Sequence, residues 1–361
     1  MASPARKNLE LLASLLVGVG LGAALATALW RGSSAPRRGS GARQLQLPAP
    51  PPPSAEDPAI LVEQLSRNAA FFGEAGTCSV QGDFVVVVGV GGVGSHAAHM
   101  LARAGVGRLR LVDFDMVSLS SLNRHATAAR SDVGTPKVAA LAAALARTVP
   151  GCAVEAVQTL FCAARAEELL AGAPDYVLDC IDDRDTKVAL LTFCRARGLR
   201  VLASMGAGGK CDPTRLRFCD LALLPSGAMD PLGTAIKAAL RKAGMFSAQY
   251  REGGGSSADA AAAAAAARTL SGITCLFSAE EPCAALLPLP PRQDPAPGAA
   301  PLVNPAELGA LENFRVRIMP VLGTMPALFG QAMAAYVLCA LAAGGGRGLL
   351  SVPPILRSAV R

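Results

Sequence analysis

The chain has 361 residues, of which 52% are hydrophobic, so it can bury a sizeable core and is not a disordered protein. Aromatic residues make up only 4%, which disfavours a single-strand nucleic-acid binder that stacks bases on aromatic side chains. The net charge of +7, from 34 basic and 27 acidic residues, suggests an anionic partner. Six basic and three acidic side chains lie in residues 1–58, however, so bulk charge is weak evidence for a nucleic acid.

The first 58 residues have the pattern of a membrane anchor. Residues 11–30 carry no charge and as a helix would span about 30 Å, the thickness of the hydrocarbon core. Arg6 and Lys7 precede this run. Basic residues at positions 31, 37, 38 and 43 follow it and predict that the rest of the chain faces the cytosol. We predict an anchor helix at 11–30 and a Pro-rich linker to residue 58; a cleaved targeting peptide is the alternative.

A nucleotide-binding pattern begins at residue 84. Residues 84–88 (F-V-V-V-V) are typical of a buried parallel strand, and residues 95–104 are prone to form a helix. Between them, G-x-G-x-x-G occurs at Gly89, Gly91 and Gly94. A strand, a glycine turn and a helix together favour phosphate binding at the helix N-terminus.

A second strand is predicted at 109–113, and it ends in an acid. Asp113 lies about 20 residues past the glycines, where an acceptor for ribose hydroxyls is expected. Two cations follow: Arg124, and Lys137 at the start of a helix predicted to extend through residue 145. They suit a triphosphate attacked at its α-phosphorus better than a nicotinamide cofactor.

A third strand with carboxylates at its end is predicted at residues 176–183. Asp182 and Asp183 would lie at the carboxyl edge of the sheet, where they could hold Mg²⁺ together with substrate phosphates.

Together these motifs resemble the ThiF/MoeB, ubiquitin-activating-enzyme-like superfamily: G-V-G-G-V-G-S, L-V-D-F-D-x-V-x-L-S-x-L-N-R, G-x-x-K and D-C-I-D. The resemblance implies a Rossmann-like, doubly wound α/β sheet over residues 59–345, with an α/β C-terminal extension. It implies that ATP is bound by Gly89, Gly91, Gly94, Asp113, Asp115 and Ser121, although the family often has Asn at the last position. Arg124 and Lys137 would contact the phosphates, and Asp182 would be the Mg²⁺ ligand. Arg67 matches an arginine that reaches the active site of the partner subunit, which implies a homodimer.

Later segments resemble one branch of this superfamily. Residues 206–214 (G-A-G-G-K-C-D-P-T) and 274–280 are similar to the tRNA threonylcarbamoyladenosine dehydratases, and the match extends from about residue 65 to 341. The resemblance implies ATP-dependent cyclisation of N6-threonylcarbamoyladenosine beside the tRNA anticodon, through adenylation of its carboxylate. The alternative is activation of the C-terminus of a ubiquitin-like or sulfur-carrier protein. Fungal relatives of this branch suggest the mitochondrial outer membrane as the location.

The remaining features carry weaker expectations. The ten cysteines include no C-x-x-C pair, which predicts against a structural zinc site and suggests reduced, mostly buried thiols. Cys275 is expected to be such a thiol; a catalytic cysteine or a sulfur relay is the alternative. Insertions are predicted near 253–267 and 286–301, and residues 346–361 form a tail. Residues 322–343 are apolar enough for a second membrane span but are expected to form a buried helix. The candidates for gripping tRNA phosphates are Arg195, Arg197, Arg200, Lys210, Arg215, Arg217, Lys237, Arg241 and Lys242.

Overall fold

The computed structural model describes residues 58–225, 227, 229–246, 271–285, 287–288 and 317–344. The predicted anchor helix at 11–30, the Pro-rich linker, the insertion at 253–267 and the tail lie outside the described residues. Of the insertion at 286–301, only two residues are described, as a short strand.

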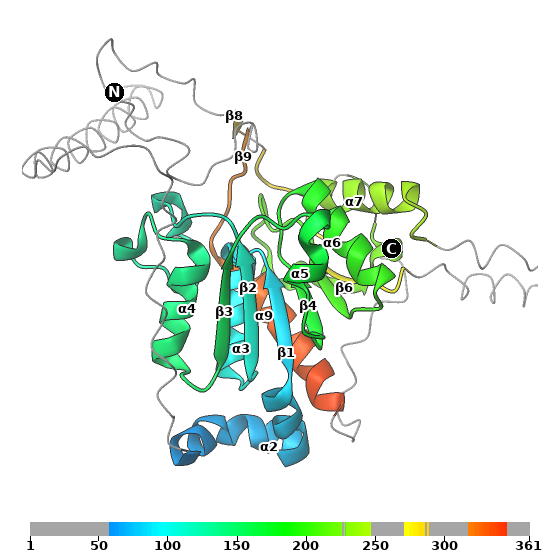
Figure 1. Ribbon diagram of the computed structural model, residues 1–361. Helices are drawn as coiled ribbons and strands as arrows, with labels where there is room; N and C mark the ends of the chain where they lie inside the picture. The colour runs from blue at the N-terminus through cyan, green and yellow to red at the C-terminus, as the bar shows by residue number, and fades with distance from the viewer. Residues whose placement is uncertain are drawn as a thin grey trace, which may run out of the picture. The chain divides into compact units, whose positions relative to one another are not determined.

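The fold is built on a seven-stranded sheet with the order β3-β2-β1-β4-β5-β7-β6 (Figure 1). Six of its strands are parallel, and β6 pairs antiparallel with β7. The sheet strands are β1 (Phe84–Val88), β2 (Arg108–Asp113), β3 (Ala153–Gln158), β4 (Tyr176–Asp179), β5 (Val201–Ser204), β6 (Leu216–Asp220) and β7 (Thr274–Ser278). A separate pair consists of β8 (Leu287–Pro288) and β9 (Arg317–Ile318). The predicted Rossmann-like α/β sheet is confirmed.

Helices cover both faces of the sheet, which explains why the central strand is apolar throughout. The helices are α2 (Pro58–Gly82), α3 (Gly92–Arg103), α4 (Lys137–Thr148), α5 (Ala166–Leu169), α6 (Arg184–Ala196), α7 (Pro231–Lys242) and α9 (Thr324–Gly344). Val85 and Val87 of β1 share one apolar cluster with residues of α3, α4 and α9. Phe84, Val86 and Val88 share the other with residues of α5, α6 and α7. Alternate side chains of one strand thus enter two cores.

Helix α9 confirms the buried helix expected near residues 322–343. It is long and apolar enough to cross a membrane, but 61% of that stretch is buried within the fold. A side chain at Gly330 would place its Cβ 2.4 Å from the carbonyl oxygen of Val93, so α9 approaches α3 closely enough to require glycine. The helix is a core element that supports the start of α3.

Helix α2 lies at the opposite end of the sheet from the glycine turn (Figure 1). The side-chain amide of Asn68 donates to the carbonyl oxygen of Ala104, just past the C-terminal end of α3, at 3.0 Å. Since α3 has 12 residues, its two ends are about 18 Å apart. Position 67 is therefore far from the start of α3 within one chain.

Candidate active site

The glycine turn between β1 and α3 depends on two glycines for its shape. Gly89 has a φ of +86°, and a Cβ there would lie 2.8 Å from the carbonyl oxygen of Cys180. A Cβ on Gly94 would lie 1.8 Å from the carbonyl oxygen of Gly89. Gly91, by contrast, precedes the first turn of α3, and among the described residues no atom beyond its two chain neighbours lies within 4 Å of the place its Cβ would take. The N-terminus of α3 is therefore open at Gly91, as a phosphate site requires.

These contacts predict that one substitution in the turn lowers stability and another weakens ATP binding. Gly94→Ala forces a methyl group into a backbone carbonyl, so the free energy of unfolding should fall by about 3 kcal/mol or more. Gly91→Ala should leave it within about 0.5 kcal/mol of the parent but weaken ATP binding, because the methyl group enters the open space. Denaturant unfolding and calorimetric ATP titration measure both effects. Equal stability of the two variants would contradict this account.

Asp113 links the glycine turn to the loop that follows β2. One oxygen of its carboxylate accepts from the backbone N–H of Val90 at 2.7 Å, and the other accepts from that of Asp115 at 2.8 Å. Burial raises the pKa of Asp113, while Lys137 acts in the opposite direction. The structure therefore holds Asp113 beside the turn, as predicted, and its role with ribose remains a prediction.

Lys137 is the first residue of α4 and is 7% exposed. Its ammonium nitrogen lies 2.7 Å from the carboxylate of Asp115, and its backbone N–H donates to the carbonyl oxygen of Asp115 at 2.9 Å. Two contacts to one residue fix Lys137 close to Asp113. The structure thus brings together three of the residues predicted to bind nucleotide.

Arg124 lies close to the start of α3, as expected. Its guanidinium donates to the carbonyl oxygen of Ser120 at 2.6 Å, and its Cδ is 3.3 Å from the place of a Cβ on Gly92. Ser121 is buried in the 3₁₀ turn η1 (Leu119–Ser121). Its hydroxyl accepts from the backbone N–H of Ser118 at 3.2 Å and lies 2.9 Å from the Ser118 hydroxyl. It therefore shapes the loop that carries Arg124.

His125 is a neighbour of this site that sequence reasoning did not single out. It is 7% exposed, and its Nδ1 accepts from the backbone N–H groups of Thr127 and Ala128. Burial, reinforced by nearby Lys137, lowers the pKa of His125 to about 4, so the imidazole is neutral at physiological pH. It thus adds no charge to the phosphate site.

The end of β4 corrects the predicted strand at 176–183. The strand stops at Asp179, whose carboxylate forms an ion pair with Lys187 of α6 at 2.8 Å; both side chains are fully buried. The carboxylate of Asp183 accepts a hydrogen bond from the backbone N–H of Thr186 and caps the N-terminus of α6, which is a structural role. Asp182 is exposed in the loop between them, at the carboxyl edge of the sheet. Of the two predicted Mg²⁺ ligands, Asp182 fits the role better.

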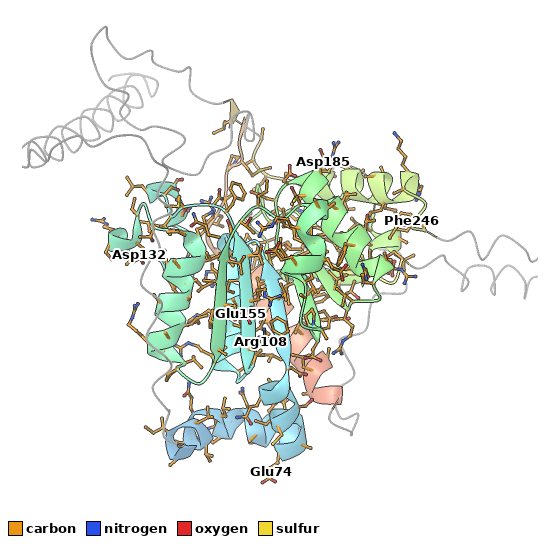
Figure 2. The ribbon with its side chains drawn as sticks, in the orientation of Figure 1. Glu74, Arg108, Asp132, Glu155, Asp185 and Phe246 are labelled. Carbon is orange, nitrogen blue, oxygen red and sulfur yellow. The ribbon has the colours of Figure 1, made fainter. Side chains whose placement is uncertain are left out.

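Arg67 is exposed on α2. This helix, which also carries Glu74, lies at the end of the sheet opposite the glycine turn (Figures 1 and 2). Within one chain it does not reach the other predicted site residues. Its predicted contribution would have to come from a second copy of the chain.

The predicted basic surface does not form as one patch. Lys210 is 2% exposed, and its ammonium group donates to the carbonyl oxygens of Met229 and Ser278, so it is a core residue. Lys237 donates to the carbonyl oxygen of Leu224 at 2.7 Å. Arg195, Arg197 and Arg200 lie at or beyond the C-terminal end of α6, at the edge away from the glycine turn. Arg215 and Arg217 flank the start of β6 and remain exposed.

Cys275 is the second residue of β7 and is fully buried, with its sulfur 3.6 Å from that of Cys219. Burial raises the pKa of Cys275 well above its ordinary value. A neutral, enclosed thiol of this kind has the expected structural role.

Comparisons with known proteins agree with this geometry. The ThiF family model matches residues 65–347. The chain is 41% identical over 287 residues to tRNA threonylcarbamoyladenosine dehydratase 2 of Saccharomyces cerevisiae. This match covers 78% of the chain and 57% of that protein. It is 38% identical over 185 residues to the Bacillus subtilis dehydratase, covering 51% of the chain and 72% of that protein.

A solved structure gives the same result for the fold. The E. coli tRNA N6-threonylcarbamoyladenosine dehydratase in complex with ATP matches with a TM-score of 0.60 and 25% identity, covering 80% of this chain and 98% of that one. The chain spans 57% and 59% of the lengths of the two yeast relatives. Because the family model covers most of the chain and the described fold agrees with it, this protein belongs to the ThiF family.

Proposed function

We propose that this protein uses ATP to dehydrate N6-threonylcarbamoyladenosine in tRNA beside the anticodon, by adenylating the carboxylate of that nucleoside. The observation that carries the proposal is the convergence of Lys137, Asp115 and Asp113 beside the open N-terminus of α3. The dehydratase names of the yeast, B. subtilis and E. coli relatives support this choice of substrate.

The site supplies what carboxylate adenylation needs. The N-terminus of α3 would bind phosphate, and the cations Lys137 and Arg124 would stabilise the charge that develops when a carboxylate attacks the α-phosphorus. Pyrophosphate leaves, and a mixed anhydride with AMP is formed. A nitrogen of the threonylcarbamoyl group then attacks the activated carbonyl, AMP leaves, and the ring closes with net loss of water. The protein mainly positions and stabilises, since the attacking nitrogen belongs to the substrate.

Magnesium fits this proposal through Asp182. An exposed carboxylate at the edge of the sheet suits an ion that keeps several waters and binds substrate phosphates. When bound, the ion would neutralise phosphate charge.

We further propose that the active protein is a homodimer, in which Arg67 of one chain reaches the site of the other. The distance between α2 and the glycine turn within one chain supports an arrangement in trans. The uncharged run at residues 11–30 supports retention on a membrane with the enzyme facing the cytosol, and the mitochondrial outer membrane is the proposed location.

The deciding experiment measures AMP release by the purified full-length chain with ATP and Mg²⁺, with and without threonylcarbamoylated tRNA. We expect AMP release to require the modified tRNA, and mass spectrometry of the digested tRNA to find a nucleoside lighter by one water. Unmodified tRNA is the control. AMP release driven by a small protein ending in Gly-Gly, with the tRNA unchanged, would instead support activation of a protein C-terminus and overturn the proposal.

A further inference from the structure

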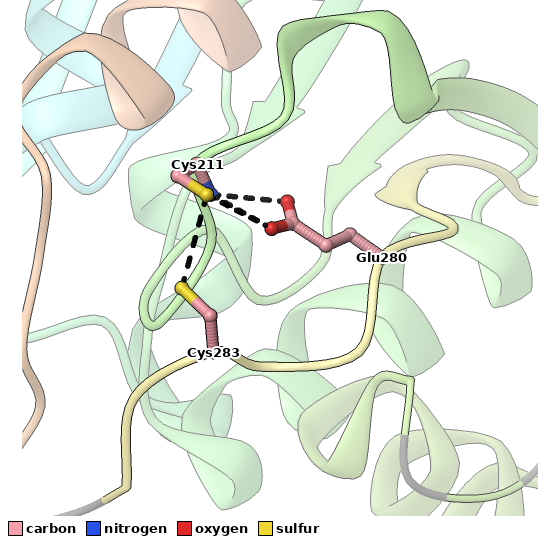
Figure 3. Close-up of side chains that lie close together, drawn as sticks. All are labelled: Cys211, Glu280 and Cys283. Carbon is pink, nitrogen blue, oxygen red and sulfur yellow. Dashed lines mark hydrogen bonds between the residues drawn. The ribbon is translucent and has the colours of Figure 1, made fainter.

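Two exposed cysteines and a glutamate meet where two loops of the sheet lie side by side (Figure 3). Cys211 is in the loop after β5, whereas Glu280 and Cys283 are in the loop after β7. Potential ligand atoms of the three side chains all lie within 4.8 Å of one another. The cluster lies outside the group formed by Lys137, Asp115 and Asp113, and the reaction proposed above does not use it.

The distances within the cluster match a tetrahedral metal site. With metal–sulfur bonds of about 2.3 Å and a metal–oxygen bond of about 2.1 Å, tetrahedral angles place two sulfurs about 3.8 Å apart and a sulfur and an oxygen about 3.6 Å apart. The two cysteine sulfurs are 3.9 Å apart, and the sulfur of Cys211 is 3.3 Å from Oε1 of Glu280. Small movements of the side chains would therefore accommodate an ion.

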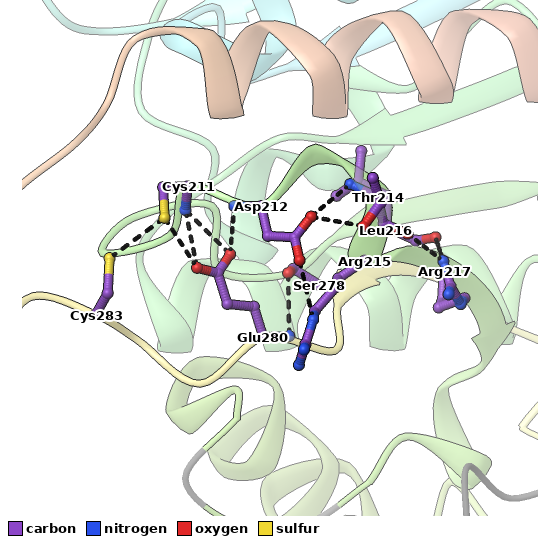
Figure 4. A network of polar contacts seen from close by, with 9 residues as sticks. All are labelled: Cys211, Asp212, Thr214, Arg215, Leu216, Arg217, Ser278, Glu280 and Cys283. Carbon is purple, nitrogen blue, oxygen red and sulfur yellow. Dashed lines mark hydrogen bonds and ion pairs between the residues drawn. The ribbon is translucent and has the colours of Figure 1, made fainter.

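Backbone groups hold the Glu280 carboxylate and tie the two loops together (Figure 4). The carboxylate of Glu280 accepts the backbone N–H groups of Cys211 and Asp212, the latter at 2.8 Å. The backbone N–H of Cys283 donates to the carbonyl oxygen of Gly209 at 2.7 Å, which ties the second loop to the first. Hydrogen bonds to a ligating carboxylate are typical of metal sites, because they fix its orientation.

We propose that Cys211, Cys283 and Glu280 bind one soft divalent cation, of which Zn²⁺ is the best match, with water in the fourth position. Two thiolates and a carboxylate form a donor set suited to zinc, and the exposure of both cysteines gives the ion a way in. The ion would replace the proton that the Cys211 thiol shares with Glu280, and it would join the loop after β5 to the loop after β7.

A disulfide between the same cysteines is the main competing outcome. The two cysteines are free in this structure, with their sulfurs 3.9 Å apart. A disulfide bond is about 2.05 Å long, whereas two sulfurs bound to one tetrahedral ion are about 3.8 Å apart. The observed separation therefore fits a shared ion better than a bond.

The test is a metal titration of the reduced, chelator-treated full-length protein. We expect one equivalent of Zn²⁺ per chain, and we expect Co²⁺ to give the intense visible bands of a tetrahedral site with thiolate charge-transfer absorption. Cys283→Ser and Glu280→Gln should each weaken Zn²⁺ binding by about 100-fold or more, since even residues behind the ligands are worth 10–100-fold. Cys78→Ser, an exposed cysteine on α2, is the matched control and should bind as the parent does.

Two results would overturn the proposal. One is a parent protein that binds no more Zn²⁺ than the Cys211→Ser/Cys283→Ser variant. The other is a metal-free protein in which peptide mapping recovers a Cys211–Cys283 disulfide under the reducing conditions used. Neither readout depends on tRNA or ATP, so failure of the metal site is distinguishable from failure of the proposed dehydratase activity.

Discussion

Replacing Lys137 with alanine is expected to lower tRNA-dependent AMP release by about 10²–10³-fold, the usual cost of losing one preorganised group that stabilises a transition state. Lys137 is almost fully buried at the start of α4 and lies 2.7 Å from Asp115. Its position is thus fixed before the substrate arrives, and no other lysine among the described residues lies at this helix start. The rate of AMP release under saturating ATP measures the effect.

A stability measurement and one control variant separate catalysis from folding. Lys137→Ala leaves the carboxylate of Asp115 without its 2.7 Å ion pair, so thermal unfolding must be measured alongside activity. Arg147→Ala changes an exposed residue in the last turn of the same helix and should leave both unchanged. If Lys137→Ala remains folded and keeps parental activity, the assigned role of Lys137 is wrong.

The sequence was sufficient to predict the strand, the glycine turn and the acid that form the first half of the candidate site. The strand at 84–88 was predicted with its correct bounds because a β-branched run directly before a glycine turn has few other interpretations. Asp113 was predicted to end the next strand, and it does, since a strand that ends in an acid at this spacing is a local pattern. The start of the first helix was predicted three residues too late, because the glycines that open it disfavour helix on propensity alone.

What the sequence could not predict are contacts between residues that only the fold brings together. Lys210 was predicted as one of the basic residues that grip tRNA phosphates, yet it fills a buried site among backbone carbonyl oxygens. The sequence has no C-x-x-C pair, yet Cys211 and Cys283, 72 residues apart, meet because β5 and β7 are neighbours. Pairing of that kind is set by strand order and leaves no local pattern.

The buried ion pair at the end of β4 leaves no local pattern either. The sequence predicts a strand that continues to residue 183, which places Asp179 inside it, and nothing local marks Lys187 of the next helix as the partner of Asp179. The two meet because α6 turns back over the strand that precedes it, which places Lys187 above the end of β4. This pair holds the base of the loop that carries Asp182, so it connects the core to the site.

Lys187→Met is accordingly expected to lower the free energy of unfolding by about 3–5 kcal/mol, because it leaves a fully buried carboxylate without its partner. Burial already raises the pKa of Asp179 and Lys187 opposes that shift, so the variant should take up a proton on Asp179 when it folds. For a domain of this size the loss corresponds to a fall of about 10 °C in unfolding temperature. Calorimetry measures it, and Arg184→Ala, which removes an exposed ion pair on the same helix, should give no measurable change.

A double variant tests whether the buried charge, and not a lost contact, is responsible. Asp179→Leu/Lys187→Met removes both charges, and apolar replacements for buried ion pairs are often neutral or stabilising. Removing the buried charge should restore about 2 kcal/mol of the free energy of unfolding that Lys187→Met loses. About 1 kcal/mol of this gain is offset, because the backbone N–H of Ile181 loses its acceptor on Asp179. If the double variant is as unstable as the single one, shape and not charge dominates at this position. A stable double variant with weak ATP-dependent activity would show that the pair has two separate roles. The core would then be intact without the charges, whereas the loop that carries Asp182 would need the ion pair to hold its position.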